Sequence, residues 1–308
     1  MDKRGKMLDI IDPSRGFGPE IGPLDIPVVS REMGRVRYVD HASTEELRVK
    51  NRDNPFVKVD QIVEVDYVWG SKTLPELVAP EAPFDYVVAS HVIEHVPDFV
   101  GWLGEIRAIL RPRGVLSLAI PDKRYCFDHF RQPSTAGDVL EAYLRRDRKP
   151  GFRQLFDYGA SFATLDGKLI WDAGATSAPM RQVPVRTAWD IARAQSSDGI
   201  YHDVHCWVFT PASFFEVLAT LIELELLDFH VARFFPTVGH EFFVSLRTLD
   251  RSDDGEAQRA AQLDSLPSLS DSVPSARGGT GDDHVLLVRR FLRRLRALLG
   301  RLKSLGRR

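Results

Sequence analysis

A strand, a helix and a second strand follow one another near the middle of the 308-residue chain. Residues 84–90 form an apolar run that predicts a buried strand. The helical pattern at 99–110 ends at Arg-Pro-Arg-Gly, residues 111–114, because proline and glycine terminate helices. Residues 115–120 predict the next strand. This order of elements predicts two parallel strands joined by a crossover helix.

The same alternation extends to both sides of this unit. Further strands are predicted at residues 17–22, 36–40, 61–66, 227–234 and 241–246. A helix beginning near Thr210-Pro211 precedes the last two, which are joined by a short Pro- and Gly-containing segment typical of an antiparallel hairpin. The expected fold is therefore α/β and Rossmann-like, with a seven-stranded sheet that is mostly parallel and ends in a C-terminal antiparallel hairpin.

Changes in composition divide the chain into regions. The main domain is expected at residues 1–250, and its segment 123–200 lacks a sustained period and is too long for a simple connection, which predicts an inserted lid or substrate-binding region. Residues 251–283 are rich in Ser, Asp, Gly and Pro, which predicts a disordered linker. Leucine at three- and four-residue steps among arginines predicts a basic amphipathic helix at 284–308.

The net charge of −2 is unevenly distributed along the chain. Residues 289–308 carry nine basic residues and no acidic one, so the preceding part has a net charge of about −11. An acidic body is unsuited to the phosphate backbone of DNA or RNA, and no nucleic-acid partner is expected. The basic tail at 285–308 suggests contact with a membrane surface or a protein partner.

The sequence carries no secretory signal and no apolar run as long as the roughly 18 residues of a membrane-spanning helix. The expected location is therefore cytoplasmic, with peripheral attachment to the inner face of the membrane as a further possibility through the tail.

An acid and a glycine at the end of the first predicted strand suggest a nucleotide pocket. Asp40 ends the second predicted strand, about 20 positions after Glu20, which is the spacing at which doubly wound folds hold a ribose. Gly22 is followed by Pro23-Leu-Asp-Ile-Pro27 rather than by the further glycines that a pyrophosphate requires. S-adenosylmethionine has a ribose but no phosphate, so this turn suits it better than a dinucleotide.

Several segments resemble class I S-adenosylmethionine-dependent methyltransferases. Glu20-Ile21-Gly22 resembles the acid-x-glycine core of their motif I, and residues 90–98 (SHVIEHVPD) with 103–118 resemble the "EHV" and "L-x-P-G-G" segments of small-molecule enzymes. Residues 203–211 (DVHCWVFTP) are similar to a segment of methyltransferases encoded among bacterial glycosyltransferases. The resemblance covers roughly residues 17–246, apart from the detail of the insertion.

This resemblance implies a set of cofactor-binding residues. Asp40 corresponds to the acid that binds the ribose, and Asp66 to the acid near the adenine amine. Cofactor contacts are further expected from the following residues: Glu20, Gly22, Ser90 and His91.

Methyl transfer to a hydroxyl requires a base, and histidines are the main candidates. His91, His95 and His205 are the expected catalytic residues, with Asp122 and His202 as further candidates. His91, Glu94 and His95 have the spacing of one helix face and could present a base or bind a divalent cation. The cluster at residues 202–206 allows the same two interpretations, so a metal is left open.

The activity expected is S-adenosylmethionine-dependent methylation, with an oxygen of a sugar, polysaccharide precursor or other small molecule as the acceptor. Two alternatives remain at this point. A non-catalytic S-adenosylmethionine-binding scaffold in glycan assembly would bind the cofactor without transferring its methyl group. A nucleotide-sugar or dinucleotide enzyme on a similar sheet would bind a different nucleotide.

Overall fold

A computed structural model describes residues 1–249 and 254–268 of the chain. The strands are β1 (Phe17–Ile21), β2 (Arg35–Asp40), β3 (Tyr67–Val68), β4 (Phe84–Ser90), β5 (Leu110–Pro121), β6 (Ala163–Thr164), β7 (Met180–Arg181), β8 (Phe229–Val238) and β9 (Glu241–Thr248). The α-helices are α1 (Lys3–Met7), α2 (Thr44–Asn51), α3 (Leu74–Val78), α4 (Phe99–Ile109), α5 (Ala136–Arg145), α6 (Phe152–Ser161), α7 (Val185–Gln195), α8 (Pro211–Glu223) and α9 (Gly255–Asp264). Short 3-10 helices are η1 (Val59–Gln61), η2 (Ile93–His95) and η3 (Lys123–Tyr125).

Seven strands form one sheet in the order β3-β2-β1-β4-β5-β9-β8. The first five run parallel to one another, whereas β9 lies antiparallel between β5 and β8. This arrangement confirms the predicted fold class, including the C-terminal antiparallel hairpin. In sequence order, β2 and β3 lie on one side of β1, whereas β4 lies on its other side. The strand order therefore reverses between β1 and β4.

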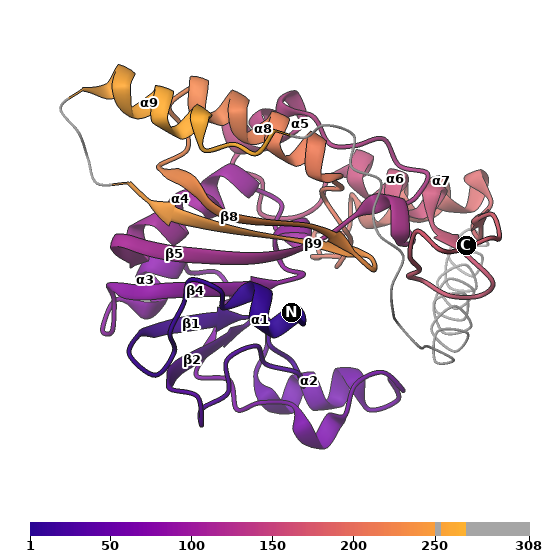
Figure 1. The fold of residues 1–308 in the computed structure, drawn as a ribbon. Coiled ribbons are helices and arrows are strands. Elements are labelled where there is room, and N and C mark those ends of the chain that lie inside the picture. The colour runs from indigo at the N-terminus through magenta and orange to yellow at the C-terminus, as the bar shows by residue number, and fades with distance from the viewer. Residues whose placement is uncertain (250–253, 269–308) are drawn as a thin grey trace.

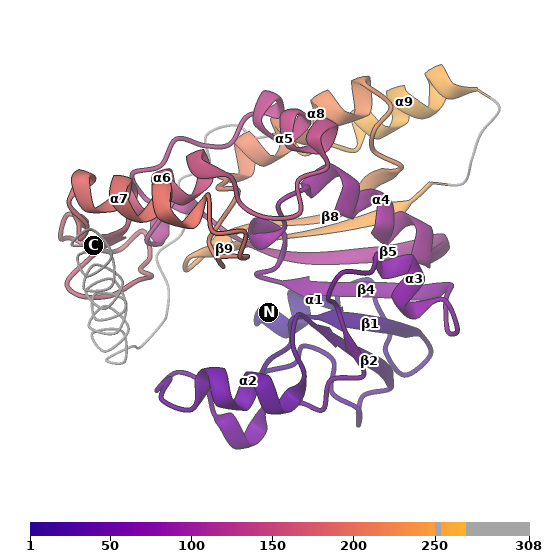
Figure 2. The same cartoon turned by 180° about the vertical axis from the view of Figure 1, so that it is seen from behind.

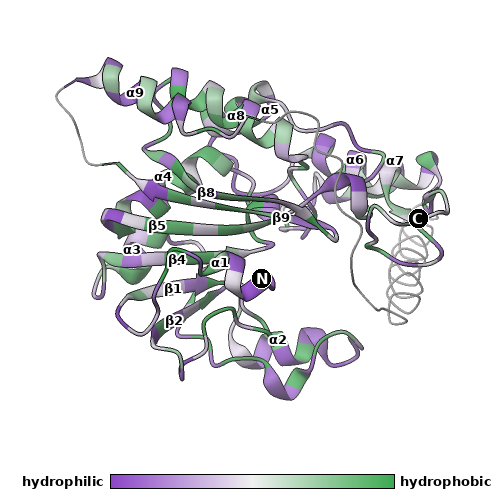
Figure 3. Cartoon of the chain, in the orientation of Figure 1, coloured by the Kyte–Doolittle hydropathy of each residue, from purple (hydrophilic) through white to green (hydrophobic). Residues whose placement is uncertain are grey.

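The two faces of the sheet are covered by different segments. One face packs against α3, α4, α5, α8 and α9 (Figures 1 and 2), and the core between them contains Val87, Ala89 and Leu218. Tyr86 and Val88 alternate with these residues along β4 and point to the other face, where they pack against Met7 of α1. Apolar colour accordingly follows much of β4, β5 and β9, whereas α2 is mostly hydrophilic (Figure 3).

Several helices, among them α4 and α8, begin after a polar residue whose side chain caps them. Asp98 accepts the N–H of Gly101 at 2.7 Å and so caps α4. Thr210 accepts the N–H of Ser213 at 3.2 Å at the start of α8, whose first residue is Pro211. The start of α8 fixes the direction of the segment that precedes it, residues 203–209.

The third strand and the predicted linker differ from the sequence-based expectation. A strand was expected at 61–66, but β3 is formed by Tyr67 and Val68. The linker prediction for 251–283 is wrong for Gly255–Asp264, which forms α9 and packs against α8 and β8. The remainder of that linker beyond residue 268, and the basic helix predicted at 284–308, lie outside the described residues.

The segment expected to be an irregular insertion contains regular structure. Of its helices, α5 packs against α4 and α8 and belongs to the layer beside the sheet, whereas α6 and α7 pack against each other at one end of the molecule (Figure 1). In the same segment of the chain, β6 and β7 pair with each other as a small antiparallel sheet. Among residues 1–249 and 254–268, no helix is long and apolar enough to cross a membrane.

Candidate functional site

The reversal of strand order between β1 and β4 marks the place where ligands bind in open α/β sheets, beyond the carboxyl ends of the strands. Gly22 directly follows β1 and His91 directly follows β4. A Cβ atom placed on Gly22 would lie 3.1 Å from Cγ2 of Val92, so the two segments are in close contact. The candidate site is therefore built from the residues that follow β1, β2, β4 and β5.

Glu20 shapes the turn after β1. Its two carboxylate oxygens accept the backbone N–H groups of Val28 and Val29 at 2.7 and 2.8 Å. Burial raises the pKa of this carboxyl group to about 7 despite these two hydrogen bonds. Both oxygens are thus used by the chain itself, and they hold the segment 23–29 against the sheet.

Gly22 adopts a backbone conformation that favours glycine. Its φ angle is +67°, and its N–H donates to the carbonyl oxygen of Val39 at 2.8 Å. The nearby Val92 side chain leaves little room for a Cβ atom. The turn therefore presents bare backbone at the edge of the sheet, where a ligand can approach closely.

Asp40 ends β2 with its carboxylate largely shielded from solvent. Its Oδ1 accepts the backbone N–H of His41 at 2.7 Å and also lies 2.7 Å from Nδ1 of that histidine. Its Oδ2 has no hydrogen-bond partner among the described residues, which leaves one acceptor for a ligand.

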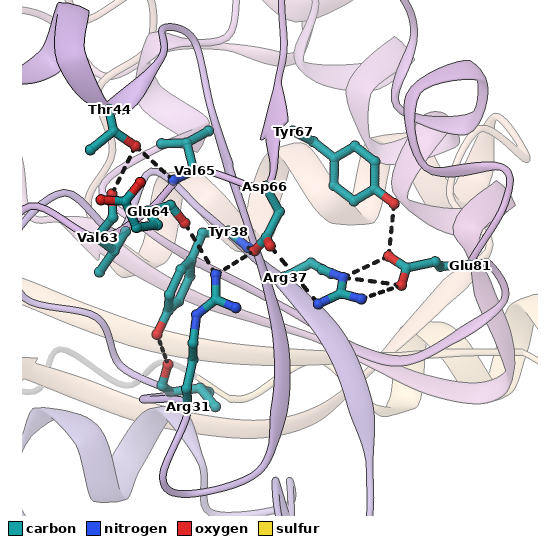
Figure 4. A network of polar contacts seen from close by, with 11 residues as sticks. Arg31, Arg37, Tyr38, Thr44, Val63, Glu64, Val65, Asp66, Tyr67 and Glu81 are labelled. Atoms are coloured by element: carbon teal, nitrogen blue, oxygen red, sulfur yellow. Dashed lines mark hydrogen bonds and ion pairs between the residues drawn. The ribbon is translucent and has the colours of Figure 1, made fainter.

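Asp66 takes part in a different network, which links the strand β2 to the segment before β3 (Figure 4). Its Oδ2 accepts the N–H of Tyr38 at 2.8 Å and a guanidinium hydrogen of Arg31 at 3.0 Å, and Arg37 lies 3.9 Å from Oδ1. Asp66 precedes β3, whereas Trp69 follows it and donates its N–H to the carbonyl of Asp40 at 2.6 Å. The residue placed beside Asp40 is therefore Trp69, which the sequence analysis did not select.

His91 is held on both sides by carboxylates. Its Nε2 lies 2.7 Å from Oε2 of Glu241, which also pairs with Lys3, and its Nδ1 lies 3.4 Å from Oε1 of Glu94. Burial alone lowers the pKa of His91, but the two carboxylates outweigh it and raise the pKa to about 9. With both ring nitrogens engaged and the ring protonated near neutral pH, His91 has no free nitrogen to act as a base.

His95 and His205 come together although they lie far apart in the sequence. Their ring centroids are 4.7 Å apart and the rings are nearly perpendicular. The Nδ1 of His95 lies 2.8 Å from Oδ1 of Asp203, and the Nδ1 of His205 lies 2.5 Å from Oδ2 of Asp128. In each ring a carboxylate fixes Nδ1 and leaves Nε2 for another partner.

Glu94 connects these two histidines. Its backbone carbonyl accepts the N–H of Cys206 at 2.6 Å, which joins η2 to the segment before α8. Its side chain is 1% exposed, and neither carboxylate oxygen has a hydrogen-bond partner. Glu94, Asp128, His205 and Lys123 lie together in one closely packed group.

The other candidate bases face different partners. The buried Asp122 accepts hydrogen bonds from Arg124 and from the hydroxyl of Thr237, the latter at 2.6 Å. His202 lies 2.7 Å from Asp198 in its own loop. Neither residue belongs to the group formed by Glu94, Asp128, His205 and Lys123.

The comparisons with known proteins identify the family. The model of the family described as "Methyltransferase domain" matches residues 3–163, which is just over half of the chain. The chain belongs to this methyltransferase family. No curated protein matches the chain.

The solved structures that match the chain include methyltransferases of low sequence identity. The CurJ carbon methyltransferase is 12% identical with a TM-score of 0.37, the match covering 79% of this chain and 51% of that one. An S-adenosylmethionine-dependent methyltransferase from Mesorhizobium loti is 12% identical with a TM-score of 0.37, covering 78% and 94%. The glycopeptide N-methyltransferase MtfA, complexed with S-adenosyl-L-homocysteine, is 12% identical with a TM-score of 0.36, covering 79% and 90%.

The cofactor of this methyltransferase is S-adenosylmethionine, as the sequence predicted. The residues at the sheet edge fit it: Gly22 leaves room for a close approach, and Oδ2 of Asp40 has no hydrogen-bond partner among the described residues. The turn that follows Gly22 contains two prolines, which have no N–H to offer a pyrophosphate.

Two buried residues that contact His205 escaped the sequence analysis. Asp128 and Arg131 lie in the segment expected to be an irregular insertion, yet both are buried, and Arg131 donates to Asp128 at 3.1 Å and to the carbonyl of His205 at 2.6 Å. Nothing in their local sequence marks them, because their role comes from contacts with residues more than 70 positions away.

Proposed function

We propose that the chain transfers the methyl group of S-adenosylmethionine to an oxygen of a sugar, a polysaccharide precursor or another small molecule. The observation that supports this most is the hydrogen-bonded pair of His205 and Asp128 beside Glu94. Glu94 follows β4 at the edge of the sheet where Gly22 follows β1. A histidine oriented by a buried carboxylate is suited to take a proton from a hydroxyl.

The cofactor contacts come from the ends of the parallel strands. Gly22 and Ser90 line the cofactor from β1 and β4, and Asp40 binds the ribose through Oδ2. Glu20 acts as a positioning residue, since both its oxygens hold Val28 and Val29. Asp66 contacts Tyr38 and Arg31 through Oδ2, and its Oδ1 faces Arg37 at 3.9 Å, so its contacts within the chain are to these residues.

The cofactor and the residues of the chain make different contributions to methyl transfer. Bound S-adenosylmethionine supplies a methyl carbon made electrophilic by its sulfonium. The chain aligns the acceptor oxygen with that carbon and excludes water. As the acceptor oxygen forms its bond to the methyl carbon, the bond from that carbon to the sulfonium sulfur would break and S-adenosylhomocysteine would leave. Nε2 of His205 would take the proton of the acceptor oxygen, and Asp128 would stabilise the imidazolium. His95, whose Nδ1 is bonded to Asp203, lies beside His205.

The uneven distribution of charge along the chain suggests which acceptors it meets and where it is located. The acidic body of the chain is unsuited to nucleic acid as the acceptor. A cytoplasmic protein attached at the inner face of the membrane through residues 285–308 would meet a lipid-linked glycan precursor there. Flotation with anionic liposomes tests this attachment: the full chain is expected to float and a chain lacking 285–308 is not, and equal flotation of both would contradict it.

Calorimetric titration with S-adenosylhomocysteine tests the cofactor site. Asp40→Asn is expected to weaken binding about 10- to 100-fold, because a hydrogen bond to a charged group contributes about 1.5–3 kcal/mol. Gly22→Ala is expected to weaken it too, since a side chain is strained at a φ of +67° and meets Val92. Asp53→Asn, at an exposed position after α2, serves as the control. Absence of binding to the wild-type chain, or binding of NAD instead, would contradict the assignment.

Transfer of a labelled methyl group tests the acceptor. The acceptors offered are nucleotide sugars, monosaccharides and short polysaccharide fragments, with the methylated position located by mass spectrometry. Label is expected on oxygen, and His205→Asn is expected to lower kcat about 100- to 10,000-fold while S-adenosylhomocysteine still binds. Label on nitrogen or carbon would refute O-methylation. Cofactor binding without transfer to any of these acceptors would favour the non-catalytic scaffold.

A further inference from the structure

Three side chains near the proposed acceptor site have the composition of a metal centre. One ligand atom from each of Glu94, His95 and His205 lies within 4.8 Å of the other two. Glu94 and His95 come from η2 after β4, and His205 comes from the segment before α8, more than 100 residues later. The tertiary fold, rather than a sequence motif, brings these three donors together.

The Glu94 carboxylate is the first observation that points to a cation. The residue is 1% exposed, and neither of its oxygens accepts a hydrogen bond, although Nδ1 of His91 lies 3.4 Å from Oε1. A buried carboxylate normally has hydrogen-bond donors or coordinates a metal, because its loss of hydration is costly. A divalent cation in contact with this carboxylate would compensate for that loss.

The orientation of the two histidines is the second observation. His95 bonds Asp203 and His205 bonds Asp128, in both cases through Nδ1. Histidine ligands of metals typically donate their second ring N–H to a carboxylate, which fixes the ring and increases its basicity. Two independent copies of this arrangement leave both Nε2 atoms as potential ligands.

The surrounding contacts hold the ligands in place without an ion. Tyr201 donates its hydroxyl hydrogen to the carbonyl of His95 at 3.0 Å, and Arg131 donates to the carbonyl of His205 at 2.6 Å. The backbone of Glu94 accepts the N–H of Cys206. The three ligands are therefore positioned by contacts of their own backbones and need little rearrangement on binding.

A second group of donors has the same spacing but different partners. His91, His240 and Glu241 also offer ligand atoms within 4.8 Å of one another. In that group the carboxylate of Glu241 already pairs with Lys3 and with His91, each at 2.7 Å. The Glu241 carboxylate already has hydrogen-bond donors within the chain, so this group lacks the buried carboxylate without a donor that distinguishes Glu94.

We propose that Glu94, His95 and His205 bind one divalent transition-metal ion such as Zn²⁺, Mn²⁺ or Fe²⁺. Two imidazoles and one carboxylate suit these ions, whereas Mg²⁺ prefers oxygen ligands alone. Three protein ligands leave a position for a water molecule or for the acceptor oxygen. The role in catalysis rests on the proposed function: with the ion bound, His205 is a ligand, and an acceptor hydroxyl coordinated to the ion releases its proton to water.

Metal binding can be measured without any methyl transfer. The full chain, without an affinity tag and after dialysis against a chelator, is titrated with Zn²⁺, Co²⁺ and Mg²⁺. Calorimetry and elemental analysis give the stoichiometry, and the visible absorption of bound Co²⁺ reports the coordination. We expect one equivalent of Zn²⁺ or Co²⁺ per chain and no comparable binding of Mg²⁺.

Variants distinguish this site from adventitious binding. Glu94→Gln and His205→Asn are expected to abolish the stoichiometric binding, and the half-exposed Asp203→Asn is expected to weaken it about 10- to 100-fold. His230→Asn, in β8, and Glu241→Gln, in the second group, are expected to leave it unchanged. Circular dichroism checks that each variant is folded, and Asp203→Asn keeps the test valid if a change at Glu94 prevents folding.

The outcomes separate this inference from the proposed function. No stoichiometric binding by the wild-type chain, or binding that survives in folded Glu94→Gln and His205→Asn, overturns the metal site. If S-adenosylhomocysteine binds and methyl transfer proceeds equally well in the chelated protein, the free imidazole is the base and the catalytic role of the ion fails, while the proposed function stands. Stoichiometric metal binding without methyl transfer to any acceptor leaves the site established and removes its catalytic role.

Discussion

Single residues at this site derive their properties from burial as much as from their type. Glu20 accepts two backbone N–H groups, which favours the charged form, yet burial raises its pKa to about 7. His91 shows the opposite balance, because the nearby carboxylates outweigh burial and raise its pKa to about 9. The sequence identifies both residues, but the sign of each shift depends on neighbours that the fold supplies.

The raised pKa of Glu20 predicts how stability depends on pH. The folded state binds this proton more tightly than the unfolded state, in which the carboxyl group has its ordinary pKa of 4.5. The contribution to stability is therefore fully present below pH 4.5 and is lost as pH rises through about 7. The free energy of unfolding is expected to fall by about 3 kcal/mol over this range, at 1.36 kcal/mol for each pKa unit. Urea unfolding at a series of pH values measures it.

Glu20→Gln should flatten this pH dependence, because the side chain stays neutral throughout. Glu45→Gln, at an exposed position on α2, should leave the dependence unchanged. A dependence of the same steepness in Glu20→Gln would show that other groups cause it.

At the scale of elements, the strongly periodic segments were predicted and the ambiguous ones were not. β1, β2, β4 and α4 begin and end within one residue of the expected positions. The segment before β3 alternates apolar and polar residues like a strand, but the N–H of Val65 donates to the hydroxyl of Thr44 instead of to a strand partner. Side chains from other elements therefore decide where β3 begins.

The helix α9 was missed because its sequence is polar, and its attachment to the sheet predicts a test. The amide of Gln262, which is buried, donates to the carbonyls of Leu227 and Phe229 at 2.6 and 2.9 Å. Gln262→Ala is expected to lower the free energy of unfolding by about 1–3 kcal/mol, since it leaves buried carbonyls without donors. Chemical denaturation of the variant measures this loss.

Glu256→Gln, at an exposed position in the first turn of α9, is the matched control and should change stability by less than about 0.5 kcal/mol. If Gln262→Ala is as stable as this control, then α9 contributes little to the packing of β8.

At the scale of the whole molecule, the N-terminal segment completes one face of the sheet. Met7 is fully buried against that face, and its carbonyl accepts the hydroxyl hydrogen of Ser117 at 2.6 Å. Lys3 reaches Glu241 and so connects α1 to the residues around His91. These contacts join the start of the chain to β5 and β9.

Removal of the Met7 side chain tests this long-range docking. Met7→Ala is expected to destabilise the fold by about 2–5 kcal/mol, because it leaves a cavity in the core beneath the sheet. Met1→Ala, at a position that is 75% exposed, should have little effect. Thermal and urea unfolding of both variants provide the measurement, and equal stability would mean that α1 is not needed to cover this face.

The sequence by itself determined the fold class, the methyltransferase family and the cofactor, because periodic apolar runs and the residues at the ends of strands are local features. It also selected His91, His95 and His205 as candidates. Only the tertiary structure decided their partners: Asp128 and Asp203 orient two of these histidines, and Glu94 lies buried between them. Ring orientation and a buried carboxylate without a hydrogen-bond donor depend on contacts across more than 70 residues, which no local pattern encodes.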